Sequence, residues 1–424
     1  MLGGSDDDNL FQWPAEKLIP QLDRIAAAGG NLIRNTMSDR KDKGFEIYAF
    51  ARRDDGKYDL DRWNEEYWER FERLLAETAK RDIFVQIEIW DRFDYSDSGT
   101  DRRWGKHPYN PANNVNYTAE ESGLAREYPD HPGTNRQPFF FTTPYQRNDR
   151  IVLKYQEKFV RRMLDHSLKY DHVLYCMDNE TSGEEAWSRY WAEFVRDRAR
   201  EKNKTVFLTE MWYDWNLAAE RHKRTFDHPE LYGFVDVSQN NHNKGSDHWT
   251  NFLKVRDSLK EKPRPIDSIK TCGATGNKFG DTDQDGIERF MKQILAGAAA
   301  ARFHRPDSGL GINDKAVAAI RSVRLLEAIV PLWSLEMKSG FLRGDSHLNA
   351  YAAGMFVTGV VVFLPQNDSV TMDLRAFSGK LNLHWIDIDR GVAKPVESIQ
   401  SNRVLNLKAP AKGNWLIAIV RPAS

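Results

Sequence analysis

Cysteine is scarce in this chain, with only two among 424 residues. Cys176 and Cys272 both lie inside strand-like stretches, so we expect two buried small side chains rather than a disulfide framework or a catalytic thiol. Long apolar runs are missing as well, which excludes a transmembrane helix. The first residues contain neither a basic region nor an apolar core, so we expect no signal peptide within this chain.

An excess of charge of either sign is also missing. The chain has 61 Lys and Arg against 62 Asp and Glu, a net charge of -1. Without a basic field we expect neither nucleic acid nor an anionic membrane as a partner. The composition does not indicate an oligomeric state.

Metal-ligand spacing is absent too, because the histidines are scattered along the chain. Residues 281–286 begin like a calcium loop, but Lys292 occupies the position where a bidentate Glu is required. Capping of the following helix by Asp explains this stretch better. We therefore expect no metal and no cofactor.

Aromatic residues are abundant, with 13 Trp, 15 Tyr and 22 Phe. Their rings suit core packing, the commoner use, and also stacking on sugar rings. The most informative stretch is His172–Thr181, an apolar run that stops abruptly at Asp178, Asn179 and Glu180. Such a run is typical of a strand buried on both faces of a parallel sheet. Because α/β folds keep their chemistry at the carboxyl ends of strands, we interpret Glu180 as a catalytic acid. The alternative is that Glu180 caps the next helix or pairs with an Arg.

Eight such strand patterns alternate with helical patterns, which predicts a (β/α)8 TIM barrel over residues 1–338. Only the tail of the first strand is expected in this chain. After Gly340 short strands separated by turn residues predict a small antiparallel β-sandwich over residues 339–424. The eight predicted barrel strands are residues 2–4, 31–37, 83–91, 172–180, 205–212, 233–242, 265–273 and 298–306. Helical spacing of apolar residues also predicts a helix from residue 61, and residues 313–337 are the predicted last barrel helix.

Polar side chains recur at the predicted strand ends, which converge on one face of a barrel. Amides, cations and Trp rings together suit a polyol such as a sugar. The candidate substrate-binding residues are Asn9, Arg34, Asn35, Trp90, Asp91, Asn179, Trp212, Gln239, Asn241, His242, Lys270, His304 and Arg305. A long segment without helical period follows at residues 92–145, and a loop of this length is usually functional. Its polar and aromatic residues form either a binding wall or a structural flap: Trp104, Tyr109, Asn110, Asn113, Asn114, His131 and Arg136.

The chain resembles a known group of enzymes at this point. Asn179-Glu180 is similar to the acid/base pair of the clan of retaining barrel glycosidases. The sequences of residues 29–36, 86–91 and 302–306 resemble a less studied branch of secreted glycoside hydrolases. Members of that branch carry an all-β C-terminal module often labelled collagen-binding, to which residues 385–391 and 409–415 are similar. The resemblance implies hydrolysis of O-glycosidic bonds in bacterial use of plant or algal polysaccharides, and a secreted or periplasmic location.

One departure from the clan concerns the second carboxylate. Retaining enzymes of the clan place a nucleophilic Glu at the end of strand seven, whereas this strand ends in Lys270-Thr-Cys-Gly. Glu210 on strand five is the first substitute and Glu88 the second, with Asp91 behind it. A wide separation between the two carboxyl groups would imply inversion. Arg34, Lys270 and Arg305 either pair with these carboxylates or bind an acidic sugar.

Three functions remain open from the sequence. The first is a glycoside hydrolase with Glu180 as proton donor and Glu210 as nucleophile or base. The second is a polysaccharide lyase in which Lys270, His242 or Tyr213 removes a proton next to a uronate carboxylate. The third is a carbohydrate-binding protein built on an inactive barrel, which the missing strand-seven Glu suggests.

Overall fold

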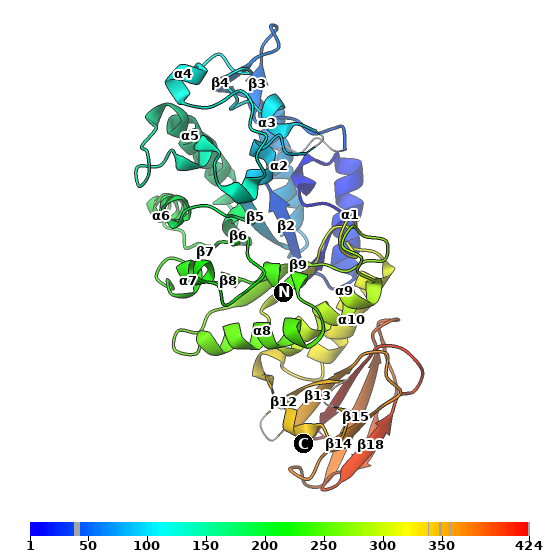
Figure 1. The fold of residues 1–424 in the computed structure, drawn as a ribbon. Helices are drawn as coiled ribbons and strands as arrows, with labels where there is room; N and C mark the ends of the chain where they lie inside the picture. The colour runs from blue at the N-terminus through cyan, green and yellow to red at the C-terminus, as the bar shows by residue number, and fades with distance from the viewer. Residues whose placement is uncertain (38–42, 100, 338, 347–349, 356–357, 423–424) are drawn as a thin grey trace. The chain divides into compact units, whose positions relative to one another are not determined.

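The computed structural model describes residues 1–37, 43–99, 101–337, 339–346, 350–355 and 358–422. Eight strands share one sheet in the order β7-β6-β5-β2-β1-β10-β9-β8, and every pairing with a recorded register among them is parallel. With their helices they form an α/β TIM barrel, followed by a β-sandwich (Figure 1), which confirms the predicted fold class. The barrel strands are β1 (Leu2–Gly4), β2 (Leu32–Thr36), β5 (Phe84–Asp91), β6 (Val173–Asn179), β7 (Phe207–Thr209), β8 (Val235–Asp236), β9 (Ile266–Thr271) and β10 (Ala300–Phe303).

The chain divides into two compact units. One consists of residues 7–23 and 33–239, and the other of residues 1–6, 24–32 and 240–424. In the first unit β5 and β6 are buried over almost their whole length and pair in parallel from Val85↔Val173 to Asp91↔Asn179. This pairing brings the polar ends of the two strands together. Three helices flank these strands along the chain: α2 (Glu65–Ala79), α5 (Arg150–Ser167) and α6 (Glu185–Glu201).

A hairpin in the first unit was not predicted. Strand β3 (Phe50–Arg52) pairs with β4 (Tyr58–Trp63), and the rings of Phe50 and Trp63 stack at 5.2 Å. The predicted helix from residue 61 is therefore wrong at its start, because α2 begins only at Glu65. Trp63 fits the helical spacing of Tyr67 and Phe71, but its ring packs on the hairpin instead.

The long segment after β5 contains short helices in place of a single structureless loop. They are η2 (Arg92–Tyr95), α3 (Arg103–Lys106), α4 (Ala119–Ser122), η3 (Pro132–Thr134) and η4 (Pro138–Phe141). Rings from several of them pack together, as Tyr95 does on Phe139 at 4.3 Å. The segment thus has a small core of its own. The first unit continues with α7 (Glu220–Phe226) and η5 (Ser238–His242), whose last residues belong to the second unit.

The second unit contains α8 (Gly245–Ser258), α9 (Asp283–Leu295) and α10 (Asp314–Glu327). Thr282 and Asp285 form a capping box at the start of α9, as expected of a helix cap in this stretch, although Thr282 is the capping residue. The last barrel helix was predicted to run to Met337 and is shorter, because α10 ends at Glu327 and a turn of 3-10 helix, η6 (Leu332–Ser334), follows.

The sandwich has a larger sheet in the order β11-β12-β13-β19-β15-β16, with β17 on β15, and a separate pair β14-β18. Its core includes Val362, Trp385 and Trp415. The predicted boundary between residues 338 and 339 touches residue 338, which lies outside the described residues. No helix in the described part of the chain is both long and apolar enough to cross a membrane. The sandwich strands are β11 (Glu336–Met337), β12 (Tyr351–Met355), β13 (Gly359–Leu364), β14 (Ser369–Asp373), β15 (Lys380–Asp387), β16 (Val392–Ala393), β17 (Glu397–Gln400), β18 (Val404–Lys408) and β19 (Trp415–Val420).

Candidate active site

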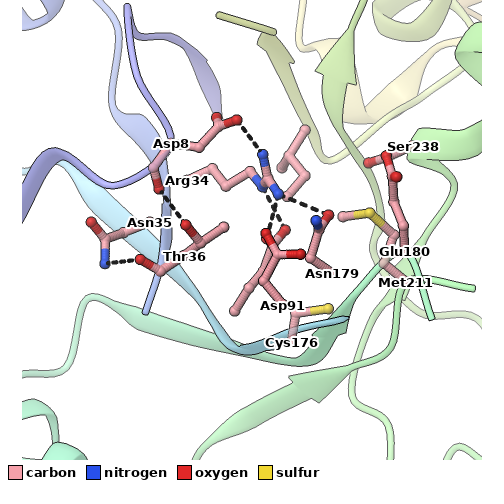
Figure 2. A network of polar contacts seen from close by, with 12 residues as sticks. Asp8, Arg34, Asn35, Thr36, Asp91, Cys176, Asn179, Glu180, Met211 and Ser238 are labelled. Carbon is pink, nitrogen blue, oxygen red and sulfur yellow. Dashed lines mark hydrogen bonds and ion pairs between the residues drawn. The ribbon is translucent and has the colours of Figure 1, made fainter. Parts of the chain in front are cut away.

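Arg34 is the centre of a buried polar network at the carboxyl ends of β2, β5 and β6. Its guanidinium donates to both oxygens of Glu88, at 2.6 Å and 2.5 Å, and to Oδ1 of Asn179 at 2.8 Å. A third nitrogen lies 2.6 Å from Oδ2 of Asp8. Figure 2 shows Arg34 between Asp8 on one side and Asn179 on the other. Predicted residues from three strands, together with Asp8, therefore meet at one guanidinium.

Carboxylates surround the guanidinium of Arg34. Burial opposes the charge of Arg34, but the carboxylates of Asp8 and Glu88 outweigh it and hold the pKa of Arg34 well above its usual value. Asp91 also acts on Arg34 electrostatically, and its own carboxylate accepts a hydrogen bond from the backbone N–H of Phe93. One guanidinium thus faces three carboxylates. Such a cluster stabilises a positive charge that develops next to it.

Glu180 follows this network directly, at the end of β6. Its φ angle is 45°, in the left-handed region that side chains other than Gly, Asn and Asp rarely adopt. The residue is partly exposed, and its Oε1 accepts a hydrogen bond from Nε2 of Gln239 at 3.1 Å. Figure 2 shows Glu180 on the side of Asn179 where Met211 and Ser238 lie. A strained, partly exposed carboxyl at the end of a buried strand is typical of a functional position.

Glu210 lies in a different environment. Its Oε1 accepts hydrogen bonds from the backbone N–H groups of Asp178 and Met211, both at 2.9 Å, and its side chain is buried. Burial, followed by the charge of Asp178, raises the pKa of Glu210 well above its usual value. A raised pKa favours the neutral carboxyl, which is a poor nucleophile, so the environment favours another carboxylate for this step; the role of Glu210 stays a prediction.

Asp178 shares the surroundings of Glu210. Burial raises the pKa of Asp178 to about 6, although Arg92 acts in the opposite direction. Nε of Arg92 lies 3.3 Å from Oδ2 of Asp178, and the guanidinium covers the ring of Phe140. Asp178 and Asn179, adjacent in sequence, therefore contact two different arginines.

Four predicted substrate-binding residues have structural partners. Trp90 packs on the ring of Trp191 in α6 at 5.1 Å. Trp212 donates from Nε1 to Oγ1 of Thr225 in α7 at 2.7 Å. Oδ1 of Asn35 accepts the backbone N–H of Phe11. The amide nitrogen of Asn9 donates to Oδ1 of Asp7 at 3.0 Å. These contacts hold the four side chains in the fold, whereas Gln239 donates to Glu180 and Asn179 precedes it in the chain.

The remaining predicted residues belong to the second unit. Asn241 accepts the backbone N–H of Cys272 at 3.4 Å, and Lys270 is buried. Nδ1 of His304 lies 2.5 Å from Oγ of Ser308, and Arg305 forms an ion pair with Asp307 at 2.9 Å. His242 is exposed and contacts the ring of Phe279 edge-on. These five predictions stay predictions.

Most polar residues of the long segment serve its own core. Trp104 donates to the carbonyl of Ala125, and Tyr109 to that of Tyr155. The predicted asparagines bond to nearby carbonyls: Asn110 to Trp104 and Arg126, Asn113 to Gly105 and His107, and Asn114 to Pro108 and Asn110. These contacts favour the structural flap for this part. His131 and Arg136 differ, because both are exposed.

The pairing of Asp8 with Arg34 was not predicted. The sequence does contain a signal for this ion pair, since Asp8 follows the first predicted strand and Arg34 lies near the end of the second. Within the described residues there is no group of three or more His, Cys, Asp or Glu side chains arranged to hold a metal ion. Arg34 and its acids lie together at Asn179, next to Glu180 in the chain, and the amide of Gln239 contacts Glu180 itself.

Known proteins resemble this chain mainly in structure. A family model described as "Domain of unknown function (DUF6298)" matches residues 49–212, which is less than half of the chain. No curated protein matches in sequence. The family model therefore covers the hairpin, the long segment, Glu180 and Glu210, without naming an activity.

Several solved structures share the fold. A glycoside hydrolase family 5 protein from Bacteroides vulgatus aligns with a TM-score of 0.63 and 13% identity, over 100% of this chain and 89% of its own. A second protein described as a glycoside hydrolase aligns with 0.62 and 12% identity, over 100% and 93%. A maltogenic α-amylase from Thermotoga neapolitana aligns with 0.58 and 11%, over 97% of each chain. At such identities the likeness shows the fold alone. The likeness of the sandwich to collagen-binding modules stays a prediction.

Proposed function

We propose that the protein hydrolyses O-glycosidic bonds, with Glu180 as the proton donor. The observation that carries this proposal is the position of Glu180: strained, partly exposed, and directly after the Asn179 that Arg34 binds. Its Oε1 accepts a hydrogen bond from the amide of Gln239, which orients the carboxyl. A carboxyl held at this position can deliver a proton to the leaving oxygen.

The Arg34 network supplies the negative charge that the reaction needs. Cleavage of a glycosidic bond passes through an oxocarbenium-like state, which carries positive charge on the sugar ring. Asp8, Glu88 and Asp91 lie around Arg34, and carboxylates beside the reacting sugar stabilise that state. One of these three carboxylates attacks the sugar or activates water, a role that the sequence had assigned first to Glu210.

Glu180→Gln tests the proton donor. Substrates are the β-linked disaccharides of glucose, mannose, xylose and galactose and the glycosyl fluorides of the same sugars, screened first with plant and algal oligosaccharides. We expect kcat/KM for the cleaved disaccharide to fall by about 10²–10⁴, the usual contribution of a general acid. The fluoride should change far less, because fluoride leaves without a proton. Glu184→Gln, four residues along the same segment, is the matched control and should match the wild type.

Ala variants at positions 8, 88 and 91 identify the second carboxylate. If one of them is the nucleophile, azide restores turnover of that variant alone on the glycosyl fluoride and gives a glycosyl azide of inverted configuration. Unchanged disaccharide cleavage by Glu180→Gln contradicts the proposal. Saturable glycan binding without cleavage would favour an inactive carbohydrate-binding barrel instead.

A lyase receives less support from the same site. Burial and the charge of Glu180 raise the pKa of Tyr213 above its usual value. A phenol with a raised pKa is protonated at neutral pH and is a poor base. Unsaturated products from a uronate polymer remain the direct test of that activity.

A further inference from the structure

The chain beyond β7 runs beside Glu180. The backbone N–H of Thr181 donates to the carbonyl of Met211, and that of Tyr213 donates to the carbonyl of Thr181, both at 2.8 Å. The pairing of these two segments thus continues past Glu180 and holds Tyr213 close to it. The charge of Glu180, after burial, contributes to the raised pKa of Tyr213, which shows the same proximity. The Tyr213 side chain is nevertheless 37% exposed.

His131 forms the other side of this position. Its ring centroid lies 6.3 Å from that of Tyr213, with a tilt of 37°, and its ring meets Phe93 edge-on at 5.5 Å. Nδ1 of His131 accepts the backbone N–H of Gly133 at 3.0 Å. The neutral imidazole therefore carries its proton on Nε2 and is a hydrogen-bond donor there.

The segment that carries His131 is fixed to the segment that carries Glu180. Oγ of Ser182 donates to the carbonyl of Pro132 at 2.9 Å, and Arg92 donates to Oδ1 of Asn135 at 2.8 Å. Arg92 also lies against Gly183, and only a residue without a side chain fits there, because a Cβ would lie 2.0 Å from a guanidinium nitrogen of Arg92. His131 and Glu180 are thus held in one arrangement.

We propose that Tyr213 and His131 form a subsite for the leaving-group sugar, an inference that rests on the proposed function. β6 lies between β5 and β7 in the sheet, so Glu180 has the Arg34 network on its β5 side and Tyr213 on its β7 side. The sugar ring that acquires positive charge is stabilised beside the carboxylates. The leaving-group sugar then lies on the opposite side of Glu180, beside Tyr213. An exposed aromatic face and an N–H donor match the apolar face and the hydroxyls of a pyranose ring.

The test compares the two substrates of the same sugar on which the wild type is active, the disaccharide and the glycosyl fluoride. Fluoride fills no sugar subsite. Tyr213→Ala and His131→Ala should each lower kcat/KM for the disaccharide about tenfold, and the fluoride value should stay within about twofold. Tyr213→Phe keeps the ring face and should retain the disaccharide value. Tyr145→Ala is the control, since this ring is 54% exposed and its hydroxyl contacts Glu193 at 2.7 Å.

The outcomes separate the two proposals. An equal loss on both substrates in Tyr213→Ala, or no loss on the disaccharide, overturns the subsite while wild-type hydrolysis upholds the proposed function. A wild-type protein that cleaves neither substrate overturns both. A selective loss on the disaccharide that Tyr213→Phe avoids establishes a leaving-group subsite.

Discussion

Arg34→Met is the most informative perturbation of the polar network, because the new side chain fills similar space without charge. The variant leaves Asp8 and Glu88, both almost completely buried, without the cation that contacts them. Breaking a buried ion pair by removing one partner usually costs about 3–5 kcal/mol. The free energy of unfolding at pH 7 should therefore fall by about that amount.

The loss should depend on pH in a definite direction. The variant can protonate one carboxyl instead of burying its charge. At 1.36 kcal/mol per pH unit above an ordinary Glu pKa of about 4.3, protonation costs about 3.7 kcal/mol at pH 7 and about 1 kcal/mol at pH 5. A carboxyl whose pKa in the folded variant is raised contributes stability in acid that is lost as the pH rises. The difference from the wild type should thus shrink by roughly 2–3 kcal/mol between pH 7 and pH 5.

Guanidinium chloride unfolding, followed by tryptophan fluorescence at both pH values, measures these differences. Arg161→Met is the control, since its ion pair with Glu157 at 2.7 Å is 41% exposed on the Arg side and should contribute less than about 1 kcal/mol. The double variant with Glu88→Gln should recover part of the loss. A cost below about 1 kcal/mol, or an equal cost at pH 5 and pH 7, would refute the reasoning about the network.

Three further predictions concern the neighbouring acids. Glu210→Gln should retain activity within about threefold and cost less than about 1 kcal/mol, because the raised pKa of Glu210 favours its neutral form and an amide oxygen can accept the same two N–H groups; a thousandfold loss of kcat would support Glu210 as the nucleophile. The pKa of Asp178 is raised to about 6, so its stabilising contribution is full below its unfolded pKa and is lost as the pH rises through 6. The wild type should accordingly lose its stability advantage over Asp178→Asn between about pH 4 and pH 6, and a growing advantage in unfolding experiments would contradict this. Glu180→Asn should gain up to about 1 kcal/mol while losing disaccharide hydrolysis, since Asn tolerates a left-handed φ; a loss above about 1 kcal/mol would argue against strain at this residue.

The strands of the barrel were predictable from the sequence because each combines an apolar run with a polar end. Residues 172–180 contain β6 and residues 83–91 contain β5, and both end where the run of apolar residues stops. Helix ends were less predictable. Trp63 has helical spacing with Tyr67, but its ring contacts Phe50 in the β3–β4 hairpin, which no local sequence pattern predicts.

The site was only partly predictable, because side-chain direction at strand ends is not given by composition. Glu88 and Trp90 are two residues apart and would share a face of a regular strand. In the structure Glu88 contacts Arg34, whereas Trp90 contacts Trp191 in a helix. Glu210 was predicted to end a strand with its carboxylate in the site, but the group turns back to the N–H groups of Asp178 and Met211. Such turns depend on tertiary contacts that the sequence does not display.

The backbone around Glu180 connects these observations. A left-handed residue costs about 1–2 kcal/mol, and it persists where the neighbouring residues are held more strongly. Before Glu180, Asn179 is held by Arg34; after it, Thr181 is held between the carbonyl of Met211 and the N–H of Tyr213. The same contacts that impose the strain place the Arg34 carboxylates on one side of Glu180 and the Tyr213 ring on the other. The left-handed φ of Glu180, the carboxylates on one side of it and the Tyr213 ring on the other therefore all follow from the pairing of β6 with β5 and β7. A proton donor at this position would act between charged groups on the β5 side and an aromatic ring on the β7 side.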